Sequence, residues 1–361
     1  MKKIDSYILK KYLTTFFFCL LLFTVIVVVV DISEKTDDFV RIKFTAWQIF
    51  TKYYIGFIPH LDAMLFPLFV FISVIFFTSK MADRSEIVAI LSSGVSYRRF
   101  LFPYWMGGIF LTVLLWVSYQ YILPKANTIW GNFLSTYIDT NVSDVNNNQQ
   151  NVYFKIDPDT YSEIRYYDTT TKAGSYFFIQ RFKDNAMTYD LRSEYIAWDT
   201  ATKKWRLSNV MQRYLIGNRE KIIHTKTLME NYNFKPGDIR SDEYFKDRLS
   251  TPQLNQYIEL EKMRGSETVN TLMVERYNRD ATPVSVIILT IIGAVLASRK
   301  TRGGSGFHLG LGVILSVLYI LFSRLSVVFA MKGNFTPLLA AWTPNIMFGI
   351  LAFYLYKKAP K

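Results

Sequence analysis

The sequence holds one cysteine and three histidines among its 361 residues. Because Cys19 has no second cysteine to pair with, an intrachain disulfide is excluded, and so few Cys and His side chains exclude a structural zinc site. His60, His224 and His308 fall in different compartments once the spans below are assigned, so neither a metal cluster nor a Ser-His-Asp arrangement is supported. Lys300–Gly306 lacks the residue order of a phosphate-binding loop. We therefore expect no catalytic residue, no metal and no cofactor bound by this chain.

Charged residues are also sparse, at 20% of the chain, whereas 50% of the residues are apolar. That mixture favours membrane spans joined to a polar domain. A bilayer core of ~30 Å needs about 20 apolar residues of helix, and six runs approach that length. They are Tyr12–Val30, Tyr54–Ser79, Phe100–Pro124, Ala281–Ser298, His308–Ala330 and Pro337–Tyr356. The first run is too long for a signal peptide and lacks a small-residue cleavage site, so we expect it to be retained.

Topology explains most of the net charge of +13. Lys and Arg gather in every second connection between spans, as the positive-inside rule requires. These segments hold three acidic residues, Asp5, Asp83 and Glu86, and 14 basic residues, Lys2, Lys3, Lys10, Lys11, Lys80, Arg84, Arg98, Arg99, Arg299, Lys300, Arg302, Lys357, Lys358 and Lys361. They account for +11 of the charge, so a nucleic-acid-binding surface is disfavoured and both termini are predicted to be cytoplasmic.

Between the third and fourth spans the sequence becomes polar and aromatic. Six short runs alternate with period two and are separated by turn residues, which is typical of strands. They are Asn151–Ile156, Glu163–Tyr167, Ser175–Phe182, Ser193–Trp198, Lys204–Leu207 and Lys221–Leu228. The predicted fold class is thus an α-helical membrane protein with an inserted extracytoplasmic all-β domain, which is either a sandwich or a jelly roll. The domain covers 125–270, with three membrane helices in 1–124 and three in 271–361.

Two helical segments follow the strands. Thr251 suits the N-cap of the first, Pro252 its first helical position and Gly265 the residue just past its end. The second, the amphipathic segment Thr268–Arg279, leads directly into the fourth span. Such a connection either transmits motion from the domain to the membrane or serves as a simple tether.

The cytoplasmic connection after the second span predicts a short amphipathic helix over 83–95. Asp83-Arg84-Ser85-Glu86 has the spacing of a capping box, with Asp83 as the N-cap and Glu86 reaching back. Apolar residues then recur at helical spacing and a glycine interrupts near the end, at Ile87, Ile90, Leu91, Val95 and Gly94. Two interpretations stay open. The helix either only turns the chain at the interface, or it is a coupling helix whose acidic start and apolar ridge enter a groove of a cytoplasmic ATPase.

Charges within or near spans are costly in lipid and are therefore candidates for function. Arg324 lies about six residues, or ~9 Å, from the outer end of the fifth span. It either snorkels to the interface or holds an anionic lipid headgroup. Lys35 and Lys125 extend this cationic rim, although neighbouring acidic residues dilute it. Asp62 is expected at the interface, near the outer end of the second span.

Together these features resemble the LptF/LptG family, the permease subunits of the bacterial lipopolysaccharide exporter. The resemblance covers essentially the whole chain and rests on the order of three helices, a β domain and three helices. The segments that carry it are Ile4-Asp5-Ser6-Tyr7-Ile8, Asp83-Arg84-Ser85-Glu86 with Gly94, Pro124, Trp205-Arg206-Leu207, Glu275-Arg276-Tyr277 with Pro283, and Trp342-Thr343-Pro344-Asn345.

The resemblance implies an ABC exporter in which this chain is a permease and not an enzyme. Two such permeases would pair in the inner membrane of a Gram-negative bacterium, and a separate LptB-like ATPase dimer would bind ATP and engage the helices around Glu86. The resemblance also implies that the inserted all-β domain is periplasmic and jelly-roll-like. Lipopolysaccharide would enter the cavity laterally, rise into this domain and pass to LptC-like and LptA-like periplasmic proteins. An apolar cavity with a cationic rim suits a lipid with several acyl chains and phosphates.

The chain departs from the family pattern in two places. Some members carry a lysine in the last turn of the first span, where this sequence has Val27–Val30, and basic residues a little beyond Pro124, where it has Trp130, Gly131 and Leu134. Headgroup contacts are therefore not carried over to these positions. The three cations of the outer rim are proposed in their place on physical grounds.

Two other classes of function stay open. A membrane-anchored periplasmic receptor or assembly scaffold would share this architecture but transport nothing, and the helix over 83–95 discriminates between the two because only a transporter has to engage an ATPase. An envelope lipid-modifying enzyme is disfavoured by the lack of a periplasmic catalytic cluster in the sequence.

Overall fold

The computed structural model describes residues 3–138, 150–157, 159–168, 171–183, 186–216, 219–236, 245–266, 268–299, 304–332 and 335–359. The chain divides into two compact units. The helical unit comprises Met1–Gly131, Lys246–Leu254 and Asn270–Lys361, and the β unit comprises Asn132–Phe245 and Asn255–Val269. Lys2, Lys300, Arg302, Lys361 and most of the segment Lys300–Gly306 lie outside the described residues.

In the described part of the chain, six helical stretches are long and apolar enough to cross a membrane, which confirms the predicted spans. Their elements are α1 (Lys3–Glu34); α3 (Ala46–Ile49), the π-helical η1 (Phe50–Tyr54) and α4 (Ile55–Asp83); α6 (Tyr97–Phe100), α7 (Phe102–Val117), η2 (Ser118–Ile122), α8 (Leu123–Phe133) and η3 (Leu134–Ile138); α13 (Val269–Ala297); α14 (Gly304–Lys332); and α15 (Pro337–Lys358). Shorter helices are α2 (Thr36–Ile42), α5 (Glu86–Ser92), α11 (Phe245–Arg248) and α12 (Thr251–Arg264).

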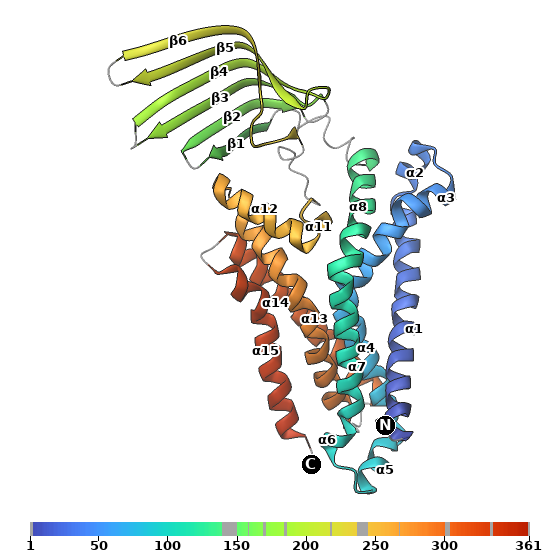
Figure 1. The fold of residues 1–361 in the computed structure, drawn as a ribbon. Coiled ribbons are helices and arrows are strands. Elements are labelled where there is room, and N and C mark those ends of the chain that lie inside the picture. The colour runs from blue at the N-terminus through green and yellow to red at the C-terminus, as the bar shows by residue number, and fades with distance from the viewer. Residues whose placement is uncertain are drawn as a thin grey trace. The chain divides into compact units, whose positions relative to one another are not determined.

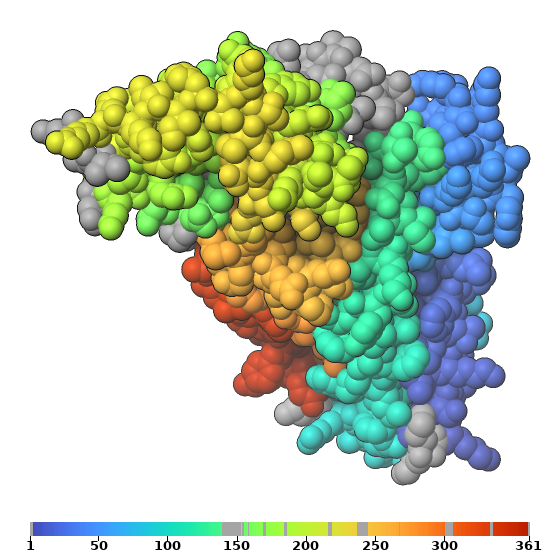
Figure 2. All heavy atoms as spheres, turned by 45° about the horizontal axis from the view of Figure 1, so that its top comes forward, coloured from blue at the N-terminus to red at the C-terminus, as the bar shows by residue number. Residues whose placement is uncertain are grey.

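Both ends of the chain lie at the same end of the helical unit as α5 and α6 (Figure 1). We call this the terminal end, and the end that holds α2 and α3 the far end. Ion pairs support the placement at the terminal end, because Asp5 in α1 pairs with Arg99 in α6 and Lys11 with Glu86 in α5. Along the bundle, α1 packs beside α4 and α7 (Figure 2).

The third span differs from its predicted end at Pro124, because the helix continues to Ile138. The π-helical turn η2 explains how. In this turn the backbone hydrogen bond joins residues five apart, because the Leu123 N–H donates to the Ser118 carbonyl. The turn comes immediately before the proline. A proline has no N–H and its ring crowds the preceding turn, and the wider turn relieves that crowding. Pro124 therefore coincides with a local change in the hydrogen-bond pattern and does not end the helix.

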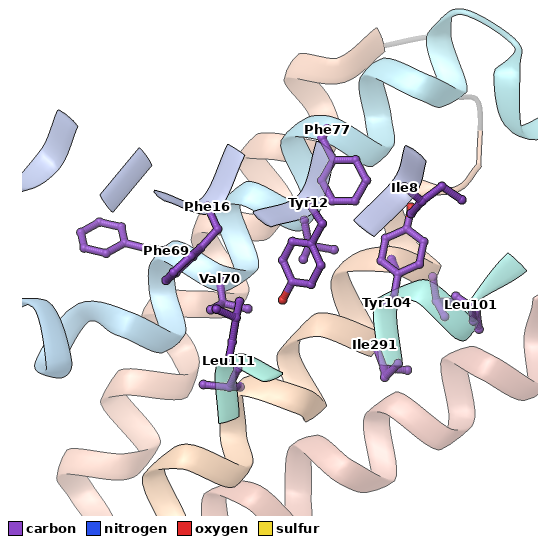
Figure 3. Packing of buried hydrophobic residues seen from close by; sticks show 14 of the residues in the cluster. Ile8, Tyr12, Phe16, Phe69, Val70, Phe77, Leu101, Tyr104, Leu111 and Ile291 are labelled. Carbon is purple, nitrogen blue, oxygen red and sulfur yellow. The ribbon is translucent and has the colours of Figure 1, made fainter. Parts of the chain in front are cut away.

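Aromatic side chains from several helices fill the core of the helical unit (Figure 3). The Phe77 ring stacks on Tyr12 at 5.8 Å and on Tyr104 at 5.5 Å between ring centroids. Both tyrosine hydroxyls have partners, since Tyr12 Oη lies 2.8 Å from Thr290 Oγ1 and Tyr104 Oη lies 2.9 Å from Thr78 Oγ1. The contact between Tyr12 and Thr290 joins α1 to α13, so the first three and the last three membrane helices share one core.

The β unit contains one antiparallel sheet of six described strands in chain order, β1 (Gln150–Asp157), β2 (Thr160–Asp168), β3 (Ala173–Lys183), β4 (Ala186–Asp199), β5 (Lys204–Ile216) and β6 (Arg219–Glu230) (Figure 1). Every predicted strand is present and each is longer than its alternating run. The inserted, jelly-roll-like β domain is therefore confirmed. Trp205 is fully buried in its core, where the indole N–H donates to the Phe234 carbonyl at 2.9 Å.

The turn between β4 and β5 is closed by an aspartate. Asp199 Oδ1 accepts from the Ala201 N–H at 3.0 Å and Oδ2 accepts from Thr202 Oγ1 at 2.9 Å. These hydrogen bonds favour the charged carboxylate and lower the pKa of Asp199. Such aspartate-centred turns join adjacent strands without a glycine.

The helix α12 begins one residue earlier than the predicted capping requires, at Thr251 instead of Pro252. Because its first residue is Thr251, the N-cap is Ser250, whose N–H donates to Gln253 Oε1 at 3.0 Å. Thr251 instead donates its hydroxyl to Gln120 Oε1 at 2.6 Å. The predicted end is confirmed, since Gly265 follows the helix with φ +67°, a conformation that favours glycine. The predicted continuity of Thr268–Arg279 with the fourth span is also confirmed by the single helix α13.

We expect Gly56→Ala to destabilise the helical unit. A Cβ at Gly56 would lie 2.4 Å from the Ala126 carbonyl oxygen and 2.6 Å from the Trp130 nitrogen, both in the backbone of α8. Since backbone cannot rotate aside, α4 and α8 must separate, at a cost of ~1–3 kcal/mol. A thermal unfolding midpoint in detergent should fall by several degrees.

Gly310→Ala is the matched control, because a Cβ there meets nothing within 4 Å. Alanine favours helix more than glycine does, so this variant should keep or raise the midpoint. Equal midpoints for the two variants would contradict close packing of α4 on α8.

Candidate functional site

The predicted capping box at Asp83 is wrong. Asp83 is the last residue of α4, because the second span continues farther than its apolar run. Ser85 then takes a left-handed conformation, with φ +59°, and α5 begins only at Glu86. A helix cannot start at a residue that still belongs to the preceding helix. Ser85 is the N-cap of α5 without a side-chain cap hydrogen bond, and Glu86 is the first helical residue, so no capping box forms.

The carboxylate of Glu86 instead binds the N-terminal segment of the chain. Its Oε2 accepts from the Tyr7 hydroxyl at 2.9 Å and lies 3.4 Å from Lys11 Nζ. Its Oε1 lies 4.0 Å from the guanidinium of Arg84, whose side chain is 60% exposed. Glu86 thus connects α5 to α1, which lies almost eighty residues away in the sequence.

The predicted apolar ridge of this helix faces the protein's own core. Ile87 is 2% exposed, and Ile90 and Leu91 pack against the same aromatic cluster that contains Tyr12. Ile90 and Leu91 are partly buried by this contact, and the short helix needs the packing to stay folded. The surface that α5 and its flanks expose consists of Asp83, Arg84, Ser85, Val88, Ala89, Ser92, Ser93 and Gly94. Gly94 has φ +86° and ends this surface.

The three predicted headgroup cations lie in different environments. Lys35 pairs with Asp31 at 2.9 Å and its ammonium lies 4.6 Å from the centroid of the Tyr53 ring, so its charge is largely balanced within the protein. Lys125 is exposed on α8 and has no ion pair among the described residues. Arg324 is exposed on α14, where it donates to the sulfur of Met64 at 3.7 Å. No hydrogen bond or ion pair in the described ranges joins these three cations.

Asp62 does not lie near the end of its helix. The helix extends back to Ala46, and the carboxylate accepts from Thr24 in α1 at 2.7 Å. Nearby along α4, His60 contacts Asn127 in α8 at 2.9 Å and lies 4.4 Å from the Trp130 ring centroid. Polar contacts of this kind join α4 to α1 and α8.

Arg279 in α13 is a buried cation that was not predicted from the sequence. It is 2% exposed, and its guanidinium donates to the carbonyls of Leu249 and Lys246 at 2.8 and 3.1 Å. It also lies 3.4 Å from Glu275 one turn earlier. Arg279 therefore fixes the segment before α12 on α13. The spacing of Glu275 and Arg279, four residues apart at the start of a span, was the available signal.

A second missed residue is Asn345 in α15. It is 4% exposed, accepts from the Tyr319 hydroxyl at 3.0 Å and donates to the Ala281 carbonyl at 2.6 Å. One amide thus joins α13, α14 and α15. Asn345 belongs to one of the segments that carried the family resemblance, so that segment has a packing role here.

In the β unit, the sheet face opposite the core carries cations and aromatic rings. Phe178 has the guanidinium groups of Arg165 and Arg192 at 5.2 and 6.0 Å from its centroid, and Lys155 lies 4.7 Å from the Tyr161 ring. Two adjoining hollows of about 630 and 610 Å³ share Phe178 and Arg192 in their walls. Both arginines are also paired with carboxylates, Arg165 with Glu163 at 2.6 Å and Arg192 with Asp190 at 3.0 Å. In the described ranges no three Cys, His, Asp or Glu side chains are grouped as metal ligands.

A family model described as "Lipopolysaccharide export system permease LptF/LptG" matches residues 6–358. The chain belongs to the LptF/LptG family. It is therefore a lipopolysaccharide export permease, a multi-pass protein of the inner membrane and a transport subunit, not a catalytic one. A search of curated proteins found no match.

We expect Arg279→Gln to loosen the helical unit. The variant leaves two carbonyls and Glu275 without their cationic partner in a buried site, which costs about 3 kcal/mol. Hydrogen exchange at residues 246–251 should rise relative to that of α13.

Arg276→Gln is the matched control. Arg276 pairs with Asp280 at 2.6 Å, but both side chains are partly exposed, so the loss should be below ~1 kcal/mol. Equal exchange in the two variants would show that Arg279 does not hold the segment.

Proposed function

We propose that this LptF/LptG permease extracts lipopolysaccharide from the inner membrane and passes it to a periplasmic bridge. In this proposal it pairs with a second permease of the family and is driven by a separate LptB-like ATPase dimer, so that this chain itself binds no cofactor. LptC-like and LptA-like proteins receive the lipid. The observation that carries the proposal is the family match over nearly the whole chain.

The terminal end of the helical unit is proposed to face the cytoplasm. Described basic side chains gather there, including Lys10, Arg84, Arg98, Arg299 and Lys358. Lys and Arg accumulate on the cytoplasmic side of short membrane connections, which supports this orientation and a periplasmic β unit.

The exposed surface of α5 is proposed to receive the ATPase. Force on α5 would pass along two routes, through Glu86 to Tyr7 and Lys11 in α1, and through Ile87 into the aromatic core. A rigid link is required because α5 is too short to hold its own shape in water. The proposed role of Glu86 is thus transmission within the chain in addition to docking.

The first span is well suited to move against a neighbour. Its outer face is apolar and uncovered, with Phe18 64%, Leu21 65% and Val29 61% exposed. The opposite flank, α14, is similar, since Ile314 is 60% and Phe329 62% exposed. These two faces are the proposed contacts with lipid and with the second permease, because apolar side chains in a membrane are covered by one or the other.

Lys125 and Arg324 are the proposed headgroup contacts at the far end. Both are exposed, whereas Lys35 is engaged by Asp31 and the Tyr53 ring. Arginine binds phosphate through a planar fork and lysine as a point charge, so both suit a phosphorylated lipid. The cationic, aromatic face of the β unit would offer the next contacts to the same substrate.

Two variants test the coupling in the complete complex reconstituted in proteoliposomes. Glu86→Lys places a cation beside Lys11 and Arg84, so we expect ATPase co-purification and ATP-driven lipopolysaccharide release to fall at least tenfold. Tyr7→Phe removes one hydrogen bond to Glu86 but leaves the exposed surface of α5 intact. It should keep the ATPase bound and lower release by a few fold.

If Glu86→Lys kept both binding and release, α5 would only turn the chain. If the wild-type chain bound lipopolysaccharide but never released it on ATP hydrolysis, a membrane-anchored receptor or scaffold would describe it better.

A further inference from the structure

An apolar groove opens on the helical unit at its terminal end, between α6–α7 and the helices α13 and α15. Its volume is about 870 Å³, which is within the range of sites that hold small molecules, ~300–1,000 Å³. The walls are Phe102 and Trp105 from the third span, Ile287 and Ile291 from α13 and Phe353 from α15. Phe102, Trp105 and Phe353 are between 43% and 59% exposed, so the described chain covers them only in part.

Small residues of α15 create the space in this groove. Gly349 lines it, and a Cβ at Gly349 would meet nothing within 4 Å. A larger side chain would therefore enter the groove without colliding with the protein. The cavity is open along its length to the surroundings of the helices, where a chain-like apolar ligand can enter from the side.

The groove also has a cationic mouth. Arg98 and Arg99 line it, and Arg98 is exposed with no ion pair among the described residues. Arg99 is already paired with Asp5. Across the groove, Lys357 Nζ lies 4.8 Å from the Phe353 ring centroid. The exposed guanidinium of Arg98 thus lies beside apolar walls. This combination is complementary to a ligand with an anionic head and an apolar tail.

We propose that this groove binds one acyl chain of an anionic phospholipid, with the lipid phosphate held by Arg98. Arginine recognises phosphate oxygens through two parallel hydrogen bonds, and the basic residues around it strengthen the attraction to an anionic headgroup. The bound lipid would contact α7 and α15 together and so bridge the first and last three helices. Its assignment to the cytoplasmic leaflet rests on the proposed orientation, whereas the binding itself does not.

The experiment compares lipid retention in two variants that act by different means. Arg98→Gln removes the phosphate contact, and Gly349→Leu fills the groove. Their matched controls are Lys10→Gln, which removes an exposed cation from α1 at the same end, and Gly310→Leu, which adds the same side chain to an open position of α14. The full-length protein is purified in detergent, titrated with phosphatidylglycerol or phosphatidylcholine and analysed by native mass spectrometry.

We expect phosphatidylglycerol retention to fall at least fivefold in Arg98→Gln and in Gly349→Leu, and to be unchanged in both controls. Phosphatidylcholine should bind weakly to every variant. Unchanged retention in both test variants, or equal binding of the two lipids, would overturn the proposal, as would a groove that retains only lipopolysaccharide. Thermal midpoints of the four variants identify any that fail to fold. Lipopolysaccharide release is measured separately, so loss of this lipid site and loss of the export function are distinguishable.

Discussion

Within the hydrocarbon there is no water to satisfy a polar side chain, and the helical unit depends on this constraint. Its buried hydroxyl and amide groups therefore bind one another across helices. Tyr12 with Thr290 joins α1 to α13, and Asn345 joins α13, α14 and α15. These contacts draw the first and last three helices, which are separated in the chain by the β unit, into one core. Aromatic stacking around Phe77 then fills the space between them.

The same constraint determines which charged side chains of the helical unit are paired within the protein. Buried ions need a partner, and Arg279 and Asp31 have theirs, in two backbone carbonyls and in the partly buried Lys35 respectively. These charges stabilise the structure and are not available to a ligand. Lys125, Arg324 and Arg98 remain exposed, on α8, α14 and α6 respectively, and α6 lies at the terminal end. The helical unit can thus meet anionic lipid at two separate levels without a large cationic field.

The proposed coupling through α5 rests on how this short helix is anchored to the rest of the helical unit. A seven-residue helix has little stability of its own, so its apolar side is buried in the core and its acidic residue is tied to α1. A partner that binds the remaining polar surface would therefore act on two packed elements at once. The long face of α1 is not packed against protein in the described chain, so α1 could shift there by displacing lipid instead of protein side chains.

The sequence by itself determined the six spans, the six strands, the family and the turn at Gly265. Each of these depends on local periodicity, apolar length or the conformational freedom of a glycine, and such properties can be read within a few consecutive residues. Only the tertiary structure decided that α4 continues through Asp83, that Ile87 faces inward, that Lys35 is balanced by Asp31 and Tyr53, and that Arg279 holds the segment before α12. The physical reason is that partners far apart in the chain, such as Tyr7 and Glu86 or Lys246 and Arg279, are selected by how the helices pack.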